Sequence, residues 1–384
     1  MRSAGSQRHS VRIRGGRTKL SWGRPAWPER RDPPAWPERR DPPTEPPGIE
    51  LSTERLDRIV EHNEGDLTAV VQAGMPLARV QEALAEADQM VSLDPPLGDD
   101  DGATIGGVVA TADSGPMRHR YGAARDVLLG ITVVLSDGTI AKAGGKVIKN
   151  VAGYDLAKLF TGSFGTLGLI VEVVVRLHPR PPENMTVVGR SADPAALGQA
   201  ALAVAHSPFG PECLDVWWTS GNGDVLARFG GAAPEAAAKE VAKLMEHTGL
   251  ETRLVEEDDA LWDRQRAGQR SADGTVVRVS GLAAELPRVV RAADRVGASL
   301  VGRAGLGLSW LTLAGADSSE VVPGIEDVRR RLHPFPCVVL DAPAAVREEV
   351  DVWGEAQAVS LMRRVKARFD PQGICNPGIF VGGI

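Results

Sequence analysis

The chain has 384 residues, of which 43% are hydrophobic and 24% charged, and its formal net charge is −6. These values are ordinary for a globular protein and leave room for two or three domains. The negative balance argues against a nucleic-acid surface, and no apolar run is long enough to span a bilayer. The basic first residues lack the apolar core of a secretion signal, so we expect a cytoplasmic protein. Cys213, Cys337 and Cys375 lie far apart, which indicates reduced thiols and neither a zinc ribbon nor an iron–sulfur cluster.

The first fifty residues predict little regular structure. Residues 1–10 are polar and are expected to be disordered. Residues 11–19 predict a short strand that runs into a tight turn containing Gly15 and Gly16. Residues 26–34 are then repeated as residues 35–43, with a density of proline and charge that prevents a packed core. We interpret residues 24–48 as a disordered proline-rich insertion.

The pattern of expected helices and strands changes at residue 183. Up to residue 182 we expect strands around Ile59 and at 67–72, a helix from Pro76, a hairpin of strands 127–135 and 139–143, a short helix ending at Phe160, and a strand at 169–177. From residue 183 helices at 194–205, 234–247, 286–296 and 322–332 alternate with strands around Val216, Leu226, Val277 and Leu311 and at 252–255. This order predicts a two-layer α+β arrangement. A last amphipathic helix is expected at 351–369.

The most informative stretch runs from Asp94 to Val175. It contains, in order, Thr104-Ile105-Gly106-Gly107, Tyr121-Gly122, Asp137-Gly138, Tyr154-Asp155 and Gly165-Thr166-Leu167-Gly168. Glycines recur in pairs beside small residues, which lets a main chain approach a bulky ligand closely. No Gly-x-Gly-x-x-Gly opens a βαβ unit here, so a Rossmann-type NAD site is not favoured.

With this ordered series the chain resembles the vanillyl-alcohol-oxidase-type FAD-binding family, also called the PCMH-type flavoproteins. The resemblance implies an α+β fold, with a PCMH-type FAD-binding domain of two α/β subdomains at 1–182 and a mixed α+β cap at 183–345. Residues 346–384 would form a C-terminal helix and an Asn-Pro-Gly segment that returns to the FAD domain. The implied FAD-binding residues are Arg14, Gly15, Gly16, Thr18, Lys19, Pro95, Thr104, Ile105, Gly106, Gly107, Ala110, Thr111, Gly115, Arg118, Tyr121, Gly122, Arg125, Asp126, Gly168, Ile170 and Asn376.

The chain departs from the family in three places. Arg17 stands where relatives usually carry a third glycine, and it could either add a phosphate partner or crowd the turn. Only about ten residues precede this turn, too few for the strand and helix that relatives place there. The turn carries Thr18 and Lys19 but not the histidine to which some relatives bind the flavin covalently, so FAD should be non-covalent.

Few residues in the sequence are candidates for catalysis. Oxidation of a 2-hydroxy acid needs a base, a cation for the carboxylate, and the flavin. The candidates are Lys149, Tyr154 and Arg278, and the histidine-rich metal motif of related enzymes is missing, so no metal site is expected.

The resemblance implies a FAD-binding subunit of a glycolate oxidase-like complex, which takes glycolate to glyoxylate. Its partners would be a related FAD-binding catalytic subunit and an iron–sulfur subunit that receives the electrons. Such a complex would be cytoplasmic, either free or attached to the inner face of the membrane through partners. Two alternatives remain open: a stand-alone FAD-dependent 2-hydroxy acid or sugar-acid oxidoreductase, and a non-catalytic scaffold subunit.

Overall fold

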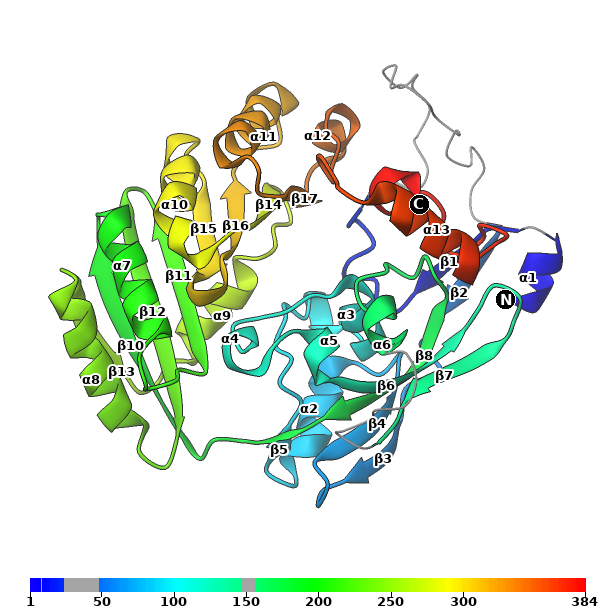
Figure 1. Cartoon of the computed structure of the whole chain (residues 1–384), viewed down its shortest axis with the longest axis horizontal. Helices are drawn as coiled ribbons and strands as arrows, with labels where there is room; N and C mark the ends of the chain where they lie inside the picture. The colour runs from blue at the N-terminus through cyan, green and yellow to red at the C-terminus, as the bar shows by residue number, and fades with distance from the viewer. Residues whose placement is uncertain (8, 24–47, 147–155) are drawn as a thin grey trace.

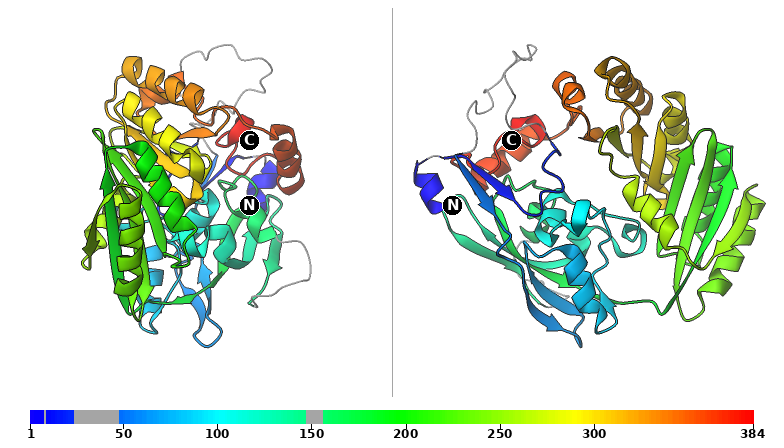
Figure 2. Two further views of the ribbon diagram at one scale, coloured as in Figure 1. Left: turned by 60° about the vertical axis from the view of Figure 1, so that its left-hand side comes forward. Right: turned by 180° about the vertical axis from the view of Figure 1, so that it is seen from behind.

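The computed structural model describes residues 1–7, 9–23, 48–146 and 156–384. Its elements form an amino-terminal region, α1 to β9, and a large sheet with helices, β10 to α12, which is called the cap below (Figure 1). The final helix α13 leaves the cap and lies beside the first strands of the chain (Figures 1 and 2). Within the described ranges no helix is both long enough and apolar enough to cross a membrane.

An antiparallel five-stranded sheet forms the centre of the amino-terminal region, with the order β3-β4-β8-β6-β7. Its middle strands are rich in β-branched residues, which pack well on a pleated surface, and they are mostly buried. The expected turn at Asp137-Gly138 is confirmed, because the strands on either side of it pair. The strands are β3 (Ile59–Asn63), β4 (Thr68–Gln72), β6 (Leu128–Val134), β7 (Ile140–Gly144) and β8 (Leu169–Arg176), with the small pair β5 (Gln89–Met90) and β9 (His178–Pro179).

Short helices cover this sheet and carry most of the glycine-rich stretch. Thr104 caps α3, since its hydroxyl accepts a hydrogen bond from the amide of Gly107 at 3.2 Å. The helices are α2 (Leu77–Ala85), η1 (Asp99–Asp101), α3 (Ile105–Thr111), α4 (Arg118–Tyr121), α5 (Ala124–Val127) and α6 (Leu156–Phe160).

The two ends of the chain meet. Strand β1 (Val11–Arg14) pairs in parallel with β2 (Ile49–Ser52), and Val11 packs with Ala4, Ile374 and Cys375 in a small core. The expected disorder of residues 1–10 is therefore wrong in part, because helix α1 (Arg2–Gln7) buries Ala4 in this core. The prediction of disorder used only the polarity of residues 1–10. Local polarity carries no information about a contact with Ile374 and Cys375, which lie more than 350 positions away.

The cap is an eight-stranded sheet with the order β13-β10-β12-β11-β15-β16-β14-β17. Both halves have the element order βαββαβ, and the halves are joined through antiparallel β11 and β15. Helices α7, α8, α10 and α11 cover its outer face (Figures 1 and 2). The elements are β10 (Glu183–Ser191), α7 (Pro194–Ala205), β11 (Cys213–Thr219), β12 (Asn222–Gly231), α8 (Pro234–His247), β13 (Glu251–Val255), α9 (Asp259–Ala267), β14 (Thr275–Ser280), η2 (Ala283–Glu285), α10 (Leu286–Arg295), β15 (Ser299–Arg303), η3 (Ala304–Leu306), β16 (Leu308–Leu313), α11 (Ser318–Leu332), β17 (Cys337–Asp341) and α12 (Ala344–Glu349).

The predicted cap helices agree with the structure, and those at 194–205 and 234–247 have the same bounds. Helix α9, which links the two halves, was not predicted. The last helix α13 (Val359–Phe369) begins eight residues later than expected, because Gly354 at φ 66° and Ala358 at φ 60° are left-handed. The chain ends with η4 (Val381–Gly383).

Candidate functional site

The turn after β1 presents unused backbone donors. The amides of Gly15, Gly16, Arg17 and Thr18 donate to no other residue in the part of the chain that the structure describes. A Cβ on Gly16 would lie 1.5 Å from the carbonyl oxygen of Gly102, so only glycine fits there. Arg17 has a φ of 63°, in the left-handed region that glycine adopts without strain. Successive free amides of this kind form a concave site for an anion such as phosphate.

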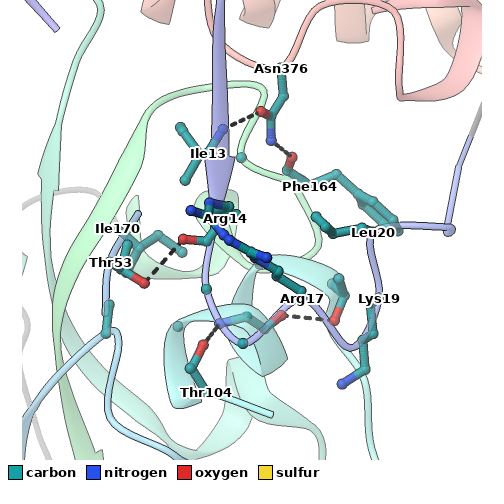
Figure 3. Close-up of a pocket in the computed structure, with 18 of the residues that line it drawn as sticks. Ile13, Arg14, Arg17, Lys19, Leu20, Thr53, Thr104, Phe164, Ile170 and Asn376 are labelled. Carbon is teal, nitrogen blue, oxygen red and sulfur yellow. Dashed lines mark hydrogen bonds between the residues drawn. The ribbon is translucent and has the colours of Figure 1, made fainter. Parts of the chain in front are cut away.

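A small cavity of about 110 Å³ lies against this turn. Its apolar walls come from Ile13, Phe164, Ile170 and Ile379, and Figure 3 shows several of these side chains around the turn. Such walls suit a flat heteroaromatic group beside the amide donors. The predicted site residues that line it are Arg14, Gly15, Gly16, Thr18, Lys19, Thr104, Gly106, Gly107, Ala110, Thr111, Gly168, Ile170 and Asn376.

Asn376 holds two walls of the small cavity together. Its Oδ1 accepts a hydrogen bond from the amide of Ile13 at 2.7 Å, and its Nδ2 donates to the carbonyl of Phe164 at 2.7 Å (Figure 3). The C-terminal segment thereby fixes β1 against the turn that precedes β8. Phe164 and Ile379 were not predicted as site residues, since a lone apolar residue in a sequence cannot be told from core.

A second cavity of about 870 Å³ shares Gly16, Arg17 and Thr18 with the first, so the turn separates the two. One wall is the loop from Asp94 to Gly98, which contains the predicted residue Pro95, and the facing wall is the end of α9 with Arg266 and Arg270. The two cavities with a donor-rich turn between them match the extended shape of a dinucleotide.

Asp94 is a partly buried carboxylate at this larger cavity. It accepts hydrogen bonds from the amide of Met117 at 3.1 and 3.3 Å, and Arg266 lies 3.6 Å away. Burial raises the pKa of Asp94 to about 6, although Arg266 opposes this effect.

The structure corrects the role expected for the Gly106–Gly107 pair. The amide of Gly106 donates to the carbonyl of Ala73 at 2.9 Å, and that of Gly107 donates to the Thr104 hydroxyl. A Cβ on Gly106 would lie 2.6 Å from the Cβ of Ala73, whereas on Gly107 it would meet only Thr104 Oγ1 at 3.2 Å. Gly106 is therefore needed for packing of α3 against β4, and Gly107 keeps one wall of the small cavity open.

Most cations around the turn are already paired. Lys19 lies 3.1 Å from Asp113, and both side chains are buried. Arg14 pairs with Glu50. Arg17 is the most exposed of the three, and its contact with Glu50 is long at 3.9 Å. Backbone amides thus supply most of the unpaired positive potential in this turn.

Seven predicted site residues line neither of these cavities. Ile105 is fully buried, Gly115 packs against the backbone of Asp94, and Arg118 donates to Ser114 Oγ. Tyr121 donates to Glu212 of the cap at 2.7 Å, which joins the amino-terminal region to the cap. The remaining three are Gly122, Arg125 and Asp126, which form a surface turn where the Asp126 carboxylate accepts from the amide of Ala123.

Of the catalytic candidates, Lys149 and Tyr154 lie outside the described residues. Arg278 lies on β14, and its Nε is buried without a hydrogen-bond partner among the described residues. Burial lowers the pKa of Arg278, Asp113 raises it, and Arg118 lowers it further. Arg278 thus stands near a carboxylate and a second cation from the amino-terminal region, with donor capacity to spare.

Two family models match the chain. A model described as "FAD binding domain" matches residues 41–144, and one described as "FAD linked oxidases, C-terminal domain" matches residues 350–379. Glycolate oxidase subunit GlcE of Escherichia coli is 30% identical over 327 residues, covering 83% of this chain and 83% of its own. An uncharacterized FAD-linked oxidoreductase of Mycobacterium tuberculosis is 26% identical over 380 residues, covering 87% and 81%.

A solved structure confirms the predicted fold class. Alkyldihydroxyacetonephosphate synthase superposes with a TM-score of 0.69 over 97% of this chain and 73% of that chain, at 15% identity. At this identity the likeness concerns the fold alone. The glycine turn, its free amides and the two adjoining cavities also fit FAD on geometric grounds.

Proposed function

Because this chain belongs to the family of FAD-linked oxidases that includes subunit GlcE of glycolate oxidase, we propose that it is a FAD-binding subunit of a glycolate oxidase-like complex. The complex would oxidise a 2-hydroxy acid, glycolate to glyoxylate, and pass the electrons to an iron–sulfur partner. The observation that best supports the proposal is the turn of four free amides between two cavities, which faces the cap.

We assign the pyrophosphate of FAD to the amides of residues 15–18. The small apolar cavity would take the adenine end, and the larger cavity beside α9 would take the flavin ring. Arg278 lines neither cavity, so the substrate is assigned to neither of them. When bound, FAD supplies the acceptor for a hydride. The chain itself would supply the amide donors of the turn and the apolar walls of the small cavity.

Arg278 is our candidate for holding the substrate carboxylate. A guanidinium offers five donors in a planar fork that matches a carboxylate, and the Nε of Arg278 has no partner among the described residues. Asp113 and Arg118 are the charged groups that influence it. Lys149 and Tyr154 remain catalytic candidates from the sequence alone, because they lie outside the described residues.

A second candidate function is a subunit that holds FAD without performing the oxidation. Among the described residues that line the two cavities there is no histidine, and the Asp94 carboxylate already accepts the Met117 amide. A proton acceptor for the substrate hydroxyl is therefore not evident among the described residues that line these two cavities. The related catalytic subunit of the complex would then supply it.

Expression of the chain alone and together with its partner subunits tests both candidates. Each preparation is given glycolate and a dye acceptor, and its visible spectrum is recorded. We expect bound flavin in both preparations and steady turnover only in the complex. Turnover by the lone chain at the rate of the complex would contradict the subunit proposal.

A variant tests whether this chain contributes to the oxidation. Arg278→Gln in the complex should raise the KM for glycolate if this subunit binds the substrate. The matched change Arg253→Gln, at an exposed arginine of β13, should leave the KM unchanged. An unchanged KM in Arg278→Gln would favour the subunit that holds FAD without catalysis.

A further inference from the structure

The segment from Thr18 to Gly23 connects the glycine turn directly to the cap. Trp22 is 2% exposed, and its indole N–H donates to the carboxylate of Asp341 at 3.0 Å. Asp341 is the last residue of β17, at the edge of the cap sheet. Farther along, Arg347 donates to the carbonyl of Gly23 at 3.1 Å. The segment is therefore bonded to the cap at both its tryptophan and its end.

Arg270, which follows α9, completes this connection. Its Nε lies 2.7 Å from Asp341 Oδ2, and its Nη2 lies 3.3 Å from Asp341 Oδ1. The same Nη2 donates to the carbonyl of Thr18 at 2.9 Å. The guanidinium also lies 5.1 Å from the ring centre of Trp22, within the range of a cation–π contact. One cap arginine thus bonds the glycine turn and the carboxylate that anchors the tryptophan.

These contacts act on the residues that carry the free amides. Thr18 is the fourth of the four consecutive amides, and its own carbonyl is the acceptor for Arg270. Arg17, next to it, is held at a left-handed φ that a non-glycine residue adopts at a cost of roughly 1 kcal/mol. A turn under such strain needs neighbouring contacts to keep one conformation. A site that is rigid before its ligand arrives loses less entropy on binding.

We infer that Arg270 and Asp341 are positioning residues that hold the glycine turn in its phosphate-binding conformation, so that the cap sets the affinity of the chain for FAD. Asp341 lines neither cavity, and Arg270, which lines the larger one, would act here through its bond to Thr18. Coupling of this kind is reciprocal: bound FAD stabilises the contact between the turn and the cap as much as the contact favours FAD. The inference rests on the proposed placement of the FAD pyrophosphate at residues 15–18, but not on the proposed oxidation of glycolate.

The test is a FAD titration of the apo form of the full chain, followed by flavin fluorescence. Asp341→Asn should weaken FAD binding by at least about tenfold, since Arg270 loses its negatively charged partner and is free to leave Thr18. The melting temperature of each apo protein is measured alongside, together with its increase at saturating FAD. That increase should be smaller in Asp341→Asn than in the parent chain.

Asp327→Asn is the matched control, because Asp327 is also an ion-paired cap aspartate, and its ion-pair partners among the described residues are Arg295, Arg330 and Arg331. It should leave the FAD affinity unchanged. An Asp341→Asn protein with a lower apo melting temperature but parental FAD affinity would overturn the inference, since that is the result of a purely structural role.

Arg270→Lys gives a second route if Asp341→Asn does not fold. A lysine keeps the charge beside Asp341 but cannot bond Asp341 with two nitrogens and reach Thr18 as well. We expect an intermediate loss of FAD affinity, and parental affinity in this variant would likewise reject the positioning role.

Discussion

Replacing Gly107 by valine should remove FAD binding without unfolding the protein. In the structure a Cβ at Gly107 would meet only Thr104 Oγ1 at 3.2 Å, and the residue lines the small cavity of about 110 Å³. The valine methyls would then occupy space assigned to the cofactor. Displacing the ligand by the width of a methyl group should cost about 3 kcal/mol, or roughly a hundredfold in affinity. The apo protein should gain a few tenths of a kcal/mol, since valine is a better helix residue than glycine.

Gly106→Val is the control for this prediction, because a valine there should destabilise the apo protein. There the new Cβ would lie 2.6 Å from the Cβ of Ala73 and 2.7 Å from its carbonyl oxygen, so α3 must move from β4 at a cost of about 1–3 kcal/mol or more. The assay measures the flavin content of purified protein and the thermal midpoint of the apo form. Normal flavin content in Gly107→Val, or a larger loss of apo stability there than in Gly106→Val, would refute the assignment of this cavity to the cofactor.

Three further predictions concern stability and the cofactor. Asp215→Ala should destabilise the cap by about 3–5 kcal/mol, because Asp215 and Arg303 are fully buried cross-strand partners at the junction of the cap halves. Chemical denaturation measures this loss, and Asp215→Leu combined with Arg303→Met should recover most of it. The pKa of Asp94 is raised to about 6 from an ordinary 3.8. Between pH 3.8 and about 6 the folded state therefore binds a proton at Asp94 that the unfolded state has released. This carboxyl should therefore lower stability by up to about 3 kcal/mol as the pH rises from 4 to 7, and Asp94→Asn should reduce the slope in urea titrations by that share, leaving the contribution of Asp215, whose pKa burial raises to about 7. Acid precipitation should release FAD into the supernatant because the turn carries Thr18 and no histidine; flavin retained by the denatured protein would exclude non-covalent binding.

The sequence alone determined the features that depend on local chemistry. The ranges 194–205 and 234–247, which each begin with a proline, were predicted as helices and are α7 and α8, and the Asp137-Gly138 pair located a hairpin. The ordered glycines indicated a cofactor domain, because glycine lets a main chain approach a bulky ligand or another backbone closely. Gly16 illustrates this, since its backbone approaches that of Gly102 too closely for a Cβ.

Only the tertiary structure decided which donors are free and which charges are paired. In the sequence the pairs Gly106-Gly107 and Gly15-Gly16 look alike. The amides of Gly106 and Gly107 donate to Ala73 and Thr104, whereas the amides of the other pair have no acceptor among the described residues. The pairing of Lys19 with Asp113 and the bond from Arg270 to Thr18 join residues up to 252 positions apart. Hydrogen-bond satisfaction and charge pairing depend on which segments meet in space, and no period or motif in one segment records its distant partner.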